Sequence, residues 1–193
     1  MSFEDLKKYK LILASKSPRR QYLLKELGLN FEIRTKEVEE NFPANLTAEQ
    51  IPLYLCEKKA SVFDEELNDD TIIITADTIV WIEGQVLNKP ESYEDAIRML
   101  KLLSGKMHEV YTGVCLKSKH KTRLFFSLTK VYFKPLSHEE IEFYIKNYNP
   151  YDKAGAYGAQ EWIGYIAVER IEGSYFNVMG LPVKELYEEL LKF

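Results

Sequence analysis

The sequence predicts an α/β fold, with a mixed, twisted sheet and flanking helices. Segments typical of strands and of helices both occur along the chain, without the strict strand–helix–strand alternation of a purely parallel sheet. No internal repeat, low-complexity segment or flexible linker interrupts them. At 193 residues the chain is long enough to bury a core, and we expect one domain spanning residues 1–193.

The elements of the first half are predicted from apolar periodicity and from residues that start and stop helices. Ser17 suits a helix N-cap, Pro18 suits the first helical position, and Gly28 suits a stop. A stretch rich in β-branched residues reads TIIITADTIVWIEG and is expected to turn at Glu83 and Gly84. The predicted strands are 10–14, 31–37 and 70–83, and the predicted helices are 18–27 and 47–63.

The second half is expected to continue the mixture of strands and helices. Ser92 is a suitable N-cap and Gly105 a suitable stop for one helix, and the last helix has one apolar face. The predicted helices are 92–103, 137–147 and 182–192, and the predicted strands are 109–117, 122–133 and 165–171. The apolar residues expected to face inward are Ile51, Tyr54, Leu55 and Ala60 in helix 47–63, and Val183, Leu186, Tyr187, Leu190 and Leu191 in the last helix.

Composition and charge limit the possible partners and location. The net charge of −4 argues against a nucleic-acid partner. Cys56 and Cys115 form no pairing motif, so we expect two buried thiols in a reducing compartment. The polar N-terminus does not resemble a signal peptide, and no apolar run reaches the roughly 18 residues of a membrane span. We therefore expect a cytoplasmic protein without a membrane partner.

The segment SKSPRR suggests an anion site at the start of the first long helix. Unpaired N–H groups and the positive end of the helix dipole favour an anion there, and Ser15, Ser17, Arg19 and Arg20 add donors. Successive helical residues diverge by about 100°, so one arginine could hold phosphate while the other reaches another part of the ligand. A capped helix with solvated arginines is the alternative. No Walker A or G-x-G-x-x-G pattern occurs.

Asp77 is the second candidate, because it interrupts a run with the composition of a buried strand. An ionised carboxylate there is costly unless it is paired, bound to metal or placed where the strand opens into a cleft. A structural ion pair with a core lysine or arginine is the alternative.

Further cations and carboxylates complete a set suited to phosphate chemistry. Lys59 lies beside Lys58 in a predicted helix, and Pro90 biases Lys89 to an extended backbone. An acidic stretch, most simply a solvated loop, contains Glu37, Glu39 and Glu40. Cations for phosphate together with carboxylates for a divalent metal or a water nucleophile are what metal-assisted cleavage of a phosphoanhydride requires.

A third segment, YDKAGAYGAQEW, is rich in small residues and could let a flat ligand approach the backbone. Gln160 within it offers both a donor and an acceptor to the edge of a base. A tight structural loop is the alternative. The later segment GSYFNVMGLPV is expected to form another ordered loop.

Together these motifs resemble the Maf family of nucleoside triphosphate pyrophosphatases. The resemblance is carried by LASKSPRR, ADTIVWIEGQVLNKP, LSGKMHEVYTGV, YDKAGAYGAQ and GSYFNVMGLPV, in this order over nearly the whole chain. It implies hydrolysis of a nucleoside triphosphate to the monophosphate and pyrophosphate with Mg²⁺ or Mn²⁺. It also implies two lobes around a deep cleft, as in the related inosine triphosphatases, and a homodimer.

The resemblance assigns roles to individual residues of this sequence. The catalytic aspartate corresponds to Asp77, which with Glu40 would bind the metal. The residues that would bind phosphate are Ser15, Arg19, Arg20, Lys59 and Lys89. The residues that would select the base are Arg19, Thr78 and Gln160.

This combination resembles the branch of the family acting on dTTP and UTP more than the branch acting on 7-methyl-GTP. Ala159 and Glu161 depart from the family pattern of a bulky apolar residue before the glutamine and a glycine after it. A non-catalytic nucleotide sensor affecting cell division and a different phosphate enzyme, such as a nucleotidyltransferase, are the alternatives from other classes.

Overall fold

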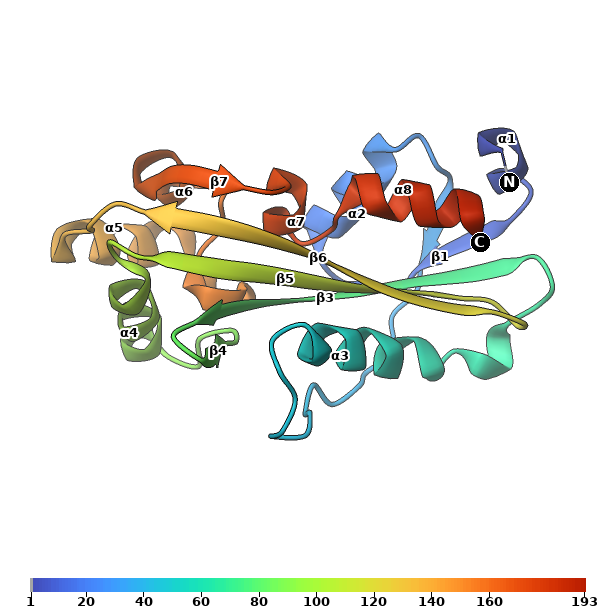
Figure 1. Ribbon diagram of the computed structural model, residues 1–193, viewed down its shortest axis with the longest axis horizontal. Helices are drawn as coiled ribbons and strands as arrows, with labels where there is room; N and C mark the ends of the chain where they lie inside the picture. The colour runs from blue at the N-terminus through green and yellow to red at the C-terminus, as the bar shows by residue number, and fades with distance from the viewer. Residues whose placement is uncertain (1) are drawn as a thin grey trace. The chain divides into compact units, whose positions relative to one another are not determined.

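The computed structural model describes residues 2–193 and confirms the α/β class with a mixed sheet (Figure 1). The strand order is β2-β1-β3-β5-β6-β7, and β4 pairs with β3. The strands are β1 (Lys10–Leu13), β2 (Phe31–Ile33), β3 (Thr71–Ile82), β4 (Gln85–Leu87), β5 (Met107–Lys117), β6 (Thr122–Phe133) and β7 (Val168–Glu172). The helices are α1 (Phe3–Leu6), α2 (Pro18–Glu26), α3 (Gln50–Ser61), α4 (Tyr93–Leu103), α5 (His138–Tyr148), α6 (Trp162–Ala167), α7 (Tyr175–Met179) and α8 (Val183–Lys192).

The chain divides into two compact units. The first consists of the chain up to Asp77 with Thr112–Ser127 and Gly180–Phe193, and the second of Thr78–Tyr111 with Leu128–Met179. Each of the long strands β3, β5 and β6 continues from one unit into the other.

The first unit is built on parallel pairing of β1 with both β2 and β3. Figure 1 shows α3 on one side of these strands and α2 and α8 on the other. Contact between α3 and the sheet is close: Thr75 Oγ1 donates to Cys56 O at 2.6 Å. A Cβ on Gly113 would lie 2.5 Å from the Pro52 carbonyl carbon, so only glycine fits there. The predicted burial of Cys56 and Cys115 is confirmed.

The second unit contains the antiparallel pairs β3–β4 and β6–β7. The predicted turn between β3 and β4 is confirmed, because Glu83 and Gly84 both have positive φ, as a tight hairpin turn requires. Its core joins α4, α5 and α6 to the strands through residues such as Leu100, Tyr144 and Ile163.

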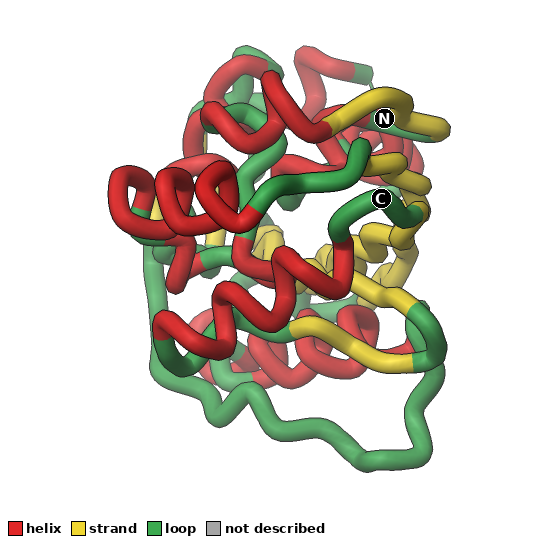
Figure 2. The backbone as a smooth tube through the Cα atoms, turned by 90° about the vertical axis from the view of Figure 1, so that its left-hand side faces the viewer, coloured by secondary structure: helices red, strands yellow, loops and turns green. Residues whose placement is uncertain are grey.

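Three sequence predictions differ from the structure. The predicted strand 165–171 begins too early, because Ile163 and Ala167 are buried one helical turn apart in α6, and β7 starts only at Val168. The predicted strand 31–37 ends at Ile33, and residues 34–49 form the extended loop at the bottom of Figure 2. Tyr54, predicted to face inward, is 37% exposed.

None of the helices in the part of the chain described is long and apolar enough to cross a membrane.

Candidate active site

The start of α2 is organised by serine side chains, as the sequence predicts. Ser17 is the N-cap, and its Oγ accepts from the Arg20 N–H at 3.4 Å, with Pro18 at the first helical position. The buried Ser15 Oγ accepts from the Ser17 N–H at 3.2 Å, and Gln21 Nε2 donates to Ser15 O at 3.1 Å. The segment that precedes the helix is therefore held at both of its ends.

Arg20 is fixed by a contact that the sequence does not reveal. Its Nε donates to Gly180 O at 2.8 Å, which joins α2 to the GLPV segment before α8. Burial lowers the pKa of Arg20, and the carboxylates of Asp77 and Glu40 act against this shift. Arg20 is thus a half-buried cation whose charge is favoured by two carboxylates. Arg19, the preceding residue of α2, is half-buried.

Asp77 lies buried in β3 and meets a cation, as its position predicts. Its Oδ1 is 2.5 Å from Lys59 Nζ of α3. The same Nζ is 2.7 Å from Glu40 Oε1, which comes from the loop 34–49. The side chains of Lys59 and Asp77 are 17% and 12% exposed, so this pair is largely shielded from water. Two carboxylates from separate segments therefore converge on one positive charge.

The loop around Glu40 separates the three predicted acidic residues. Glu39 accepts from Asn41 Nδ2 at 3.0 Å, and Glu37 is exposed, with its carboxylate 3.9 Å from Lys16. Only Glu40 of this group reaches Lys59. Lys58, the residue before Lys59, is half-buried and donates to Asn41 Oδ1 at 2.5 Å. Lys59 of α3, and not Lys58, reaches Asp77.

The pair of Glu40 and Asp77 fits a divalent cation that takes its other ligands from substrate. In residues 2–193 no group of three or more His, Cys, Asp or Glu side chains is arranged as a complete metal cage. Mg²⁺ in phosphate-transfer sites is commonly held by one or two carboxylates, with water and phosphate oxygens completing its shell. Carboxylate oxygens that already converge on the Lys59 ammonium match that requirement.

The remaining predicted residues belong to the second unit. Thr78 follows Asp77 in β3 and is half-buried, and Lys89 is exposed on the connection from β4 to α4. The neighbouring Asn88 O accepts from the Gly155 N–H at 3.1 Å, which ties this connection to the segment YDKAG. Gln160 is half-buried, and its Oε1 is a buried acceptor without a hydrogen-bond partner in the structure as described.

A buried ion pair beside Gln160 was missed by the sequence reasoning. Lys153 Nζ is 3.0 Å from Glu161 Oε1, and Tyr144 of α5 donates to Glu161 Oε2. A lysine and a glutamate eight positions apart in a loop have no regular spacing that would signal this contact. The only available clue was the departure from the family pattern at Glu161.

The segment GSYFN has a structural explanation within the second unit. Asn177 is fully buried, and its Nδ2 donates to Val110 O at 3.1 Å and to Thr129 Oγ1 at 3.0 Å. Thr129 Oγ1 also donates to Ser174 O at 3.1 Å. A Cβ on Gly173 would lie 2.7 Å from that Oγ1, so glycine is required. These contacts fix the segment against β5 and β6, but the loop prediction is wrong in part, because Tyr175–Met179 forms α7.

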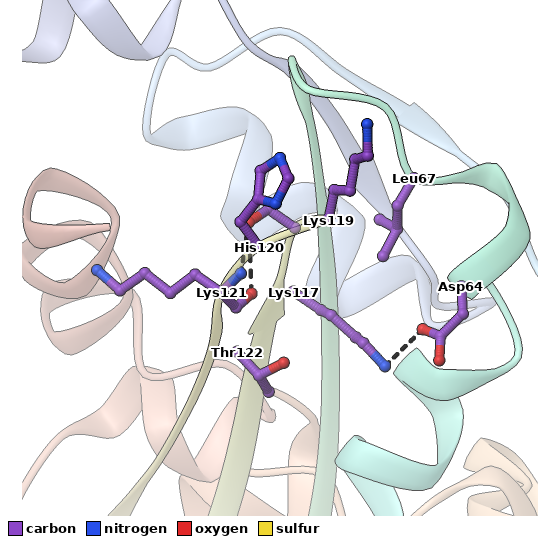
Figure 3. Close-up of a pocket in the computed structure, with 8 residues that line it drawn as sticks. Asp64, Leu67, Lys117, Lys119, His120, Lys121 and Thr122 are labelled. Atoms are coloured by element: carbon purple, nitrogen blue, oxygen red, sulfur yellow. Dashed lines mark hydrogen bonds and ion pairs between the residues drawn. The ribbon is translucent and has the colours of Figure 1, made fainter.

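A pocket of about 400 Å³ lies at the β5–β6 hairpin of the first unit, away from the predicted residues. Figure 3 shows Lys117 pointing to Asp64, at 2.5 Å, and Lys119 and His120 both contact Asp69. Lys121 donates to the C-terminal residue Phe193. None of the residues predicted to bind substrate lines this pocket.

Comparison with known sequences identifies the class of protein. A family model described as Maf-like protein matches residues 10–193, and the chain belongs to this family.

Its relatives are similar over nearly their whole length. The dTTP/UTP pyrophosphatase of Phocaeicola vulgatus is 55% identical over 190 residues, covering 98% of each chain. The dTTP/UTP pyrophosphatase of Flavobacterium johnsoniae is 54% identical, covering 97% of this chain and 96% of its own. The solved structure of the Staphylococcus aureus Ham1 protein shares the fold, with a TM-score of 0.52 and 13% identity, covering 95% of this chain and 98% of its own.

Proposed function

We propose that this protein hydrolyses dTTP and UTP to the monophosphate and pyrophosphate. The observation that carries the chemistry is the convergence of Asp77 and Glu40 on Lys59. The substrate class is supported by the relatives named dTTP/UTP pyrophosphatase, which are more than half identical to this chain over nearly its full length.

The reaction breaks the phosphoanhydride between the α- and β-phosphates and adds one water. Asp77 orients that water and accepts its proton, while Lys59 balances the negative charge of the two carboxylates. A bound Mg²⁺ or Mn²⁺, held by Glu40 and Asp77, would neutralise part of the phosphate charge. Several further cations are needed, because a triphosphate carries about four negative charges and a divalent ion offsets two.

The phosphate-binding role is proposed for the start of α2 together with the two lysines. Arg20 is already held by Gly180, so it can offer a guanidinium in a defined direction. The proposed phosphate ligands are Ser15, Arg19, Arg20, Lys59 and Lys89.

Base selection is proposed for Gln160, with Arg19 and Thr78. Uracil and thymine show an N–H between two carbonyl groups. The unpartnered Oε1 of Gln160 would accept from that N–H, and its amide would donate to one carbonyl. Cytosine has no N–H at this position, so CTP would leave the buried acceptor unpaired and be a poor substrate.

A panel of nucleoside triphosphates tests the proposal. Purified protein is incubated with Mg²⁺ or Mn²⁺ and with dTTP, UTP, CTP, GTP or 7-methyl-GTP, and the products are identified by chromatography. We expect dTTP and UTP to give monophosphate and pyrophosphate, and EDTA to stop the reaction. Faster cleavage of CTP, GTP or 7-methyl-GTP would overturn the substrate assignment, and no cleavage of any nucleotide would overturn the enzyme assignment.

We also propose the homodimer that the family resemblance implies. Light scattering that gives twice the mass of one chain would support it, and the mass of a single chain would contradict it.

A further inference from the structure

The chain around Gln160 forms a tight turn in the second unit. The turn runs from Gly158 to Glu161 and is closed by the Glu161 N–H, which donates to Gly158 O at 3.0 Å. Gln160 is the third residue of this turn, so the direction of its side chain depends on the two ends.

Both ends of the turn are tied to one hydroxyl group. Tyr144 OH of α5 accepts from the Gly158 N–H at 3.0 Å and donates to Glu161 Oε2. Burial, with Glu161 nearby, raises the pKa of Tyr144, so the hydroxyl stays protonated and can donate. A single oxygen on a helix therefore fixes the first and last residues of the turn.

The glutamate is held on its other side by a buried cation. Glu161 Oε1 is 3.0 Å from Lys153 Nζ, which is also 2.6 Å from Asp152 Oδ1. The side chains of Lys153 and Glu161 are only 8% and 21% exposed. Removing one partner of such a pair leaves a buried charge unpaired, so the geometry is strongly constrained.

The turn has little room to adopt a second arrangement. A Cβ on Gly158 would lie 2.9 Å from both Gln160 Nε2 and Glu161 Cδ, so the two side chains pack directly over the glycine. Gln160 Nε2 thus packs against Gly158, and the N–H of this glycine donates to Tyr144.

We propose that Tyr144, Glu161 and Lys153 are positioning residues that aim the Gln160 amide and thereby set base selectivity. None of the three has to touch the nucleotide. The inference rests on the proposed function, in which Gln160 reads the base. A displacement of the amide by about 1 Å is enough to cost up to about a hundredfold in rate.

The test compares kcat/KM on UTP with kcat/KM on CTP for each variant. Both substrates report on the same folded molecules, so partial unfolding lowers both values and leaves their ratio unchanged. In Tyr144→Phe and Glu161→Ala we expect the UTP:CTP ratio to fall by about ten- to a hundredfold, through loss of rate on UTP. Glu161→Gln, which can still accept from Tyr144, should retain more of the ratio than Glu161→Ala.

Tyr148→Phe is the matched control. Tyr148 stacks on Tyr144 with ring centroids 5.3 Å apart, and it makes none of the hydrogen bonds of the turn. Its UTP:CTP ratio should stay within about twofold of wild type, because the substitution removes a hydroxyl from the same helix without touching the turn.

The outcomes separate this inference from the proposed function. A wild type without preference for UTP, or a Gln160→Ala variant with the wild-type ratio, overturns the role of Gln160 and the inference with it. If Gln160→Ala lowers the ratio but Tyr144→Phe and Glu161→Ala do not, only the positioning role is overturned. If Glu161→Ala fails to fold, the ratio measured for Tyr144→Phe tests the positioning role, because that variant deletes only one oxygen.

Discussion

The charged cluster at Lys59 and the turn at Gln160 differ in how their polar groups are paired. In the first unit, Asp77 and Glu40 both contact the Lys59 ammonium within 2.7 Å, so these three charges are paired with one another. In the second unit, Gln160 presents a neutral amide whose Oε1 has no partner among residues 2–193. The polar groups of the first region are therefore paired within the protein, whereas the second leaves one buried acceptor unpaired.

Under the proposed function, this difference gives affinity and selectivity to different regions. Phosphate groups are the same in every nucleoside triphosphate, so a charged cluster binds them without regard to the base. A buried polar group that must be paired discriminates much more strongly than an apolar surface does. Substitutions in the charged cluster should therefore slow all nucleotides equally, and substitutions at the turn should change their ratio.

Asp77→Asn should cause the largest loss of kcat/KM, and the loss should be equal for UTP and CTP. The amide cannot accept the proton of the attacking water and is a weaker metal ligand, so kcat/KM should fall by about 10² to 10⁴ on UTP and CTP alike. Steady-state kinetics on both nucleotides measure this, with thermal unfolding as the check that the fold is kept. Near wild-type turnover in a folded Asn variant would show that Asp77 is only half of a structural ion pair.

Lys59→Ala should also slow both substrates by one common factor. The substitution removes the cation between Asp77 and Glu40 and one donor for phosphate, a loss of about 10² to 10³ in rate. The expected result is an unchanged UTP:CTP ratio of kcat/KM. A change of this ratio by more than about threefold would contradict the separation of phosphate binding from base selection.

The residues that were predictable from sequence are those governed by local regularity. Ser17 and Pro18 follow from helix-start chemistry. Asp77 stood out because it interrupts an apolar strand. Each of these signals lies within a few residues of the position that it identifies.

The contacts that were not predictable join distant segments without a regular period. Arg20 meets Gly180 across 160 positions, and Tyr144 meets Glu161 through a loop. The start of β7 was misplaced for a similar reason, because the short apolar segment of α6 suits a helix or a strand until its packing is known.

A buried histidine contacts the residue that precedes the turn at Gln160. We expect it to make the free energy of unfolding fall at acidic pH. His108 is buried, and its Nε2 is 2.7 Å from the hydroxyl of Tyr157, the residue before Gly158. Burial lowers the pKa of His108 from 6.5 to about 3. Below pH 6.5 this imidazole is protonated in the unfolded chain but stays neutral in the folded chain. Its contribution to stability is therefore complete above pH 6.5 and falls as the pH drops toward 3.

Urea unfolding at pH 7 and pH 5 measures this effect. The His108 contribution to the loss of unfolding free energy over this range is about 2 kcal/mol. His108→Gln, which can still hydrogen-bond to Tyr157 but does not titrate, should lose that much less than wild type. His138→Gln, at an exposed histidine, is the control and should lose as much as wild type. Equal losses in wild type and His108→Gln would contradict the buried neutral imidazole.

Lys58→Ala should have the smallest effect, and it tests how the charged cluster is held. Lys58 does not reach Asp77 but donates to Asn41, the neighbour of Glu40, and so steadies the loop that brings Glu40 to Lys59. A partly exposed hydrogen bond of this kind is worth about 1 kcal/mol, so kcat/KM should fall about threefold to tenfold on UTP and CTP alike. The metal concentration giving half-maximal activity should rise, because Glu40 is the proposed ligand that the loop carries. A loss as large as that of Lys59→Ala would mean that Lys58 contacts the substrate itself, and a shifted UTP:CTP ratio would mean that the loop also senses the base.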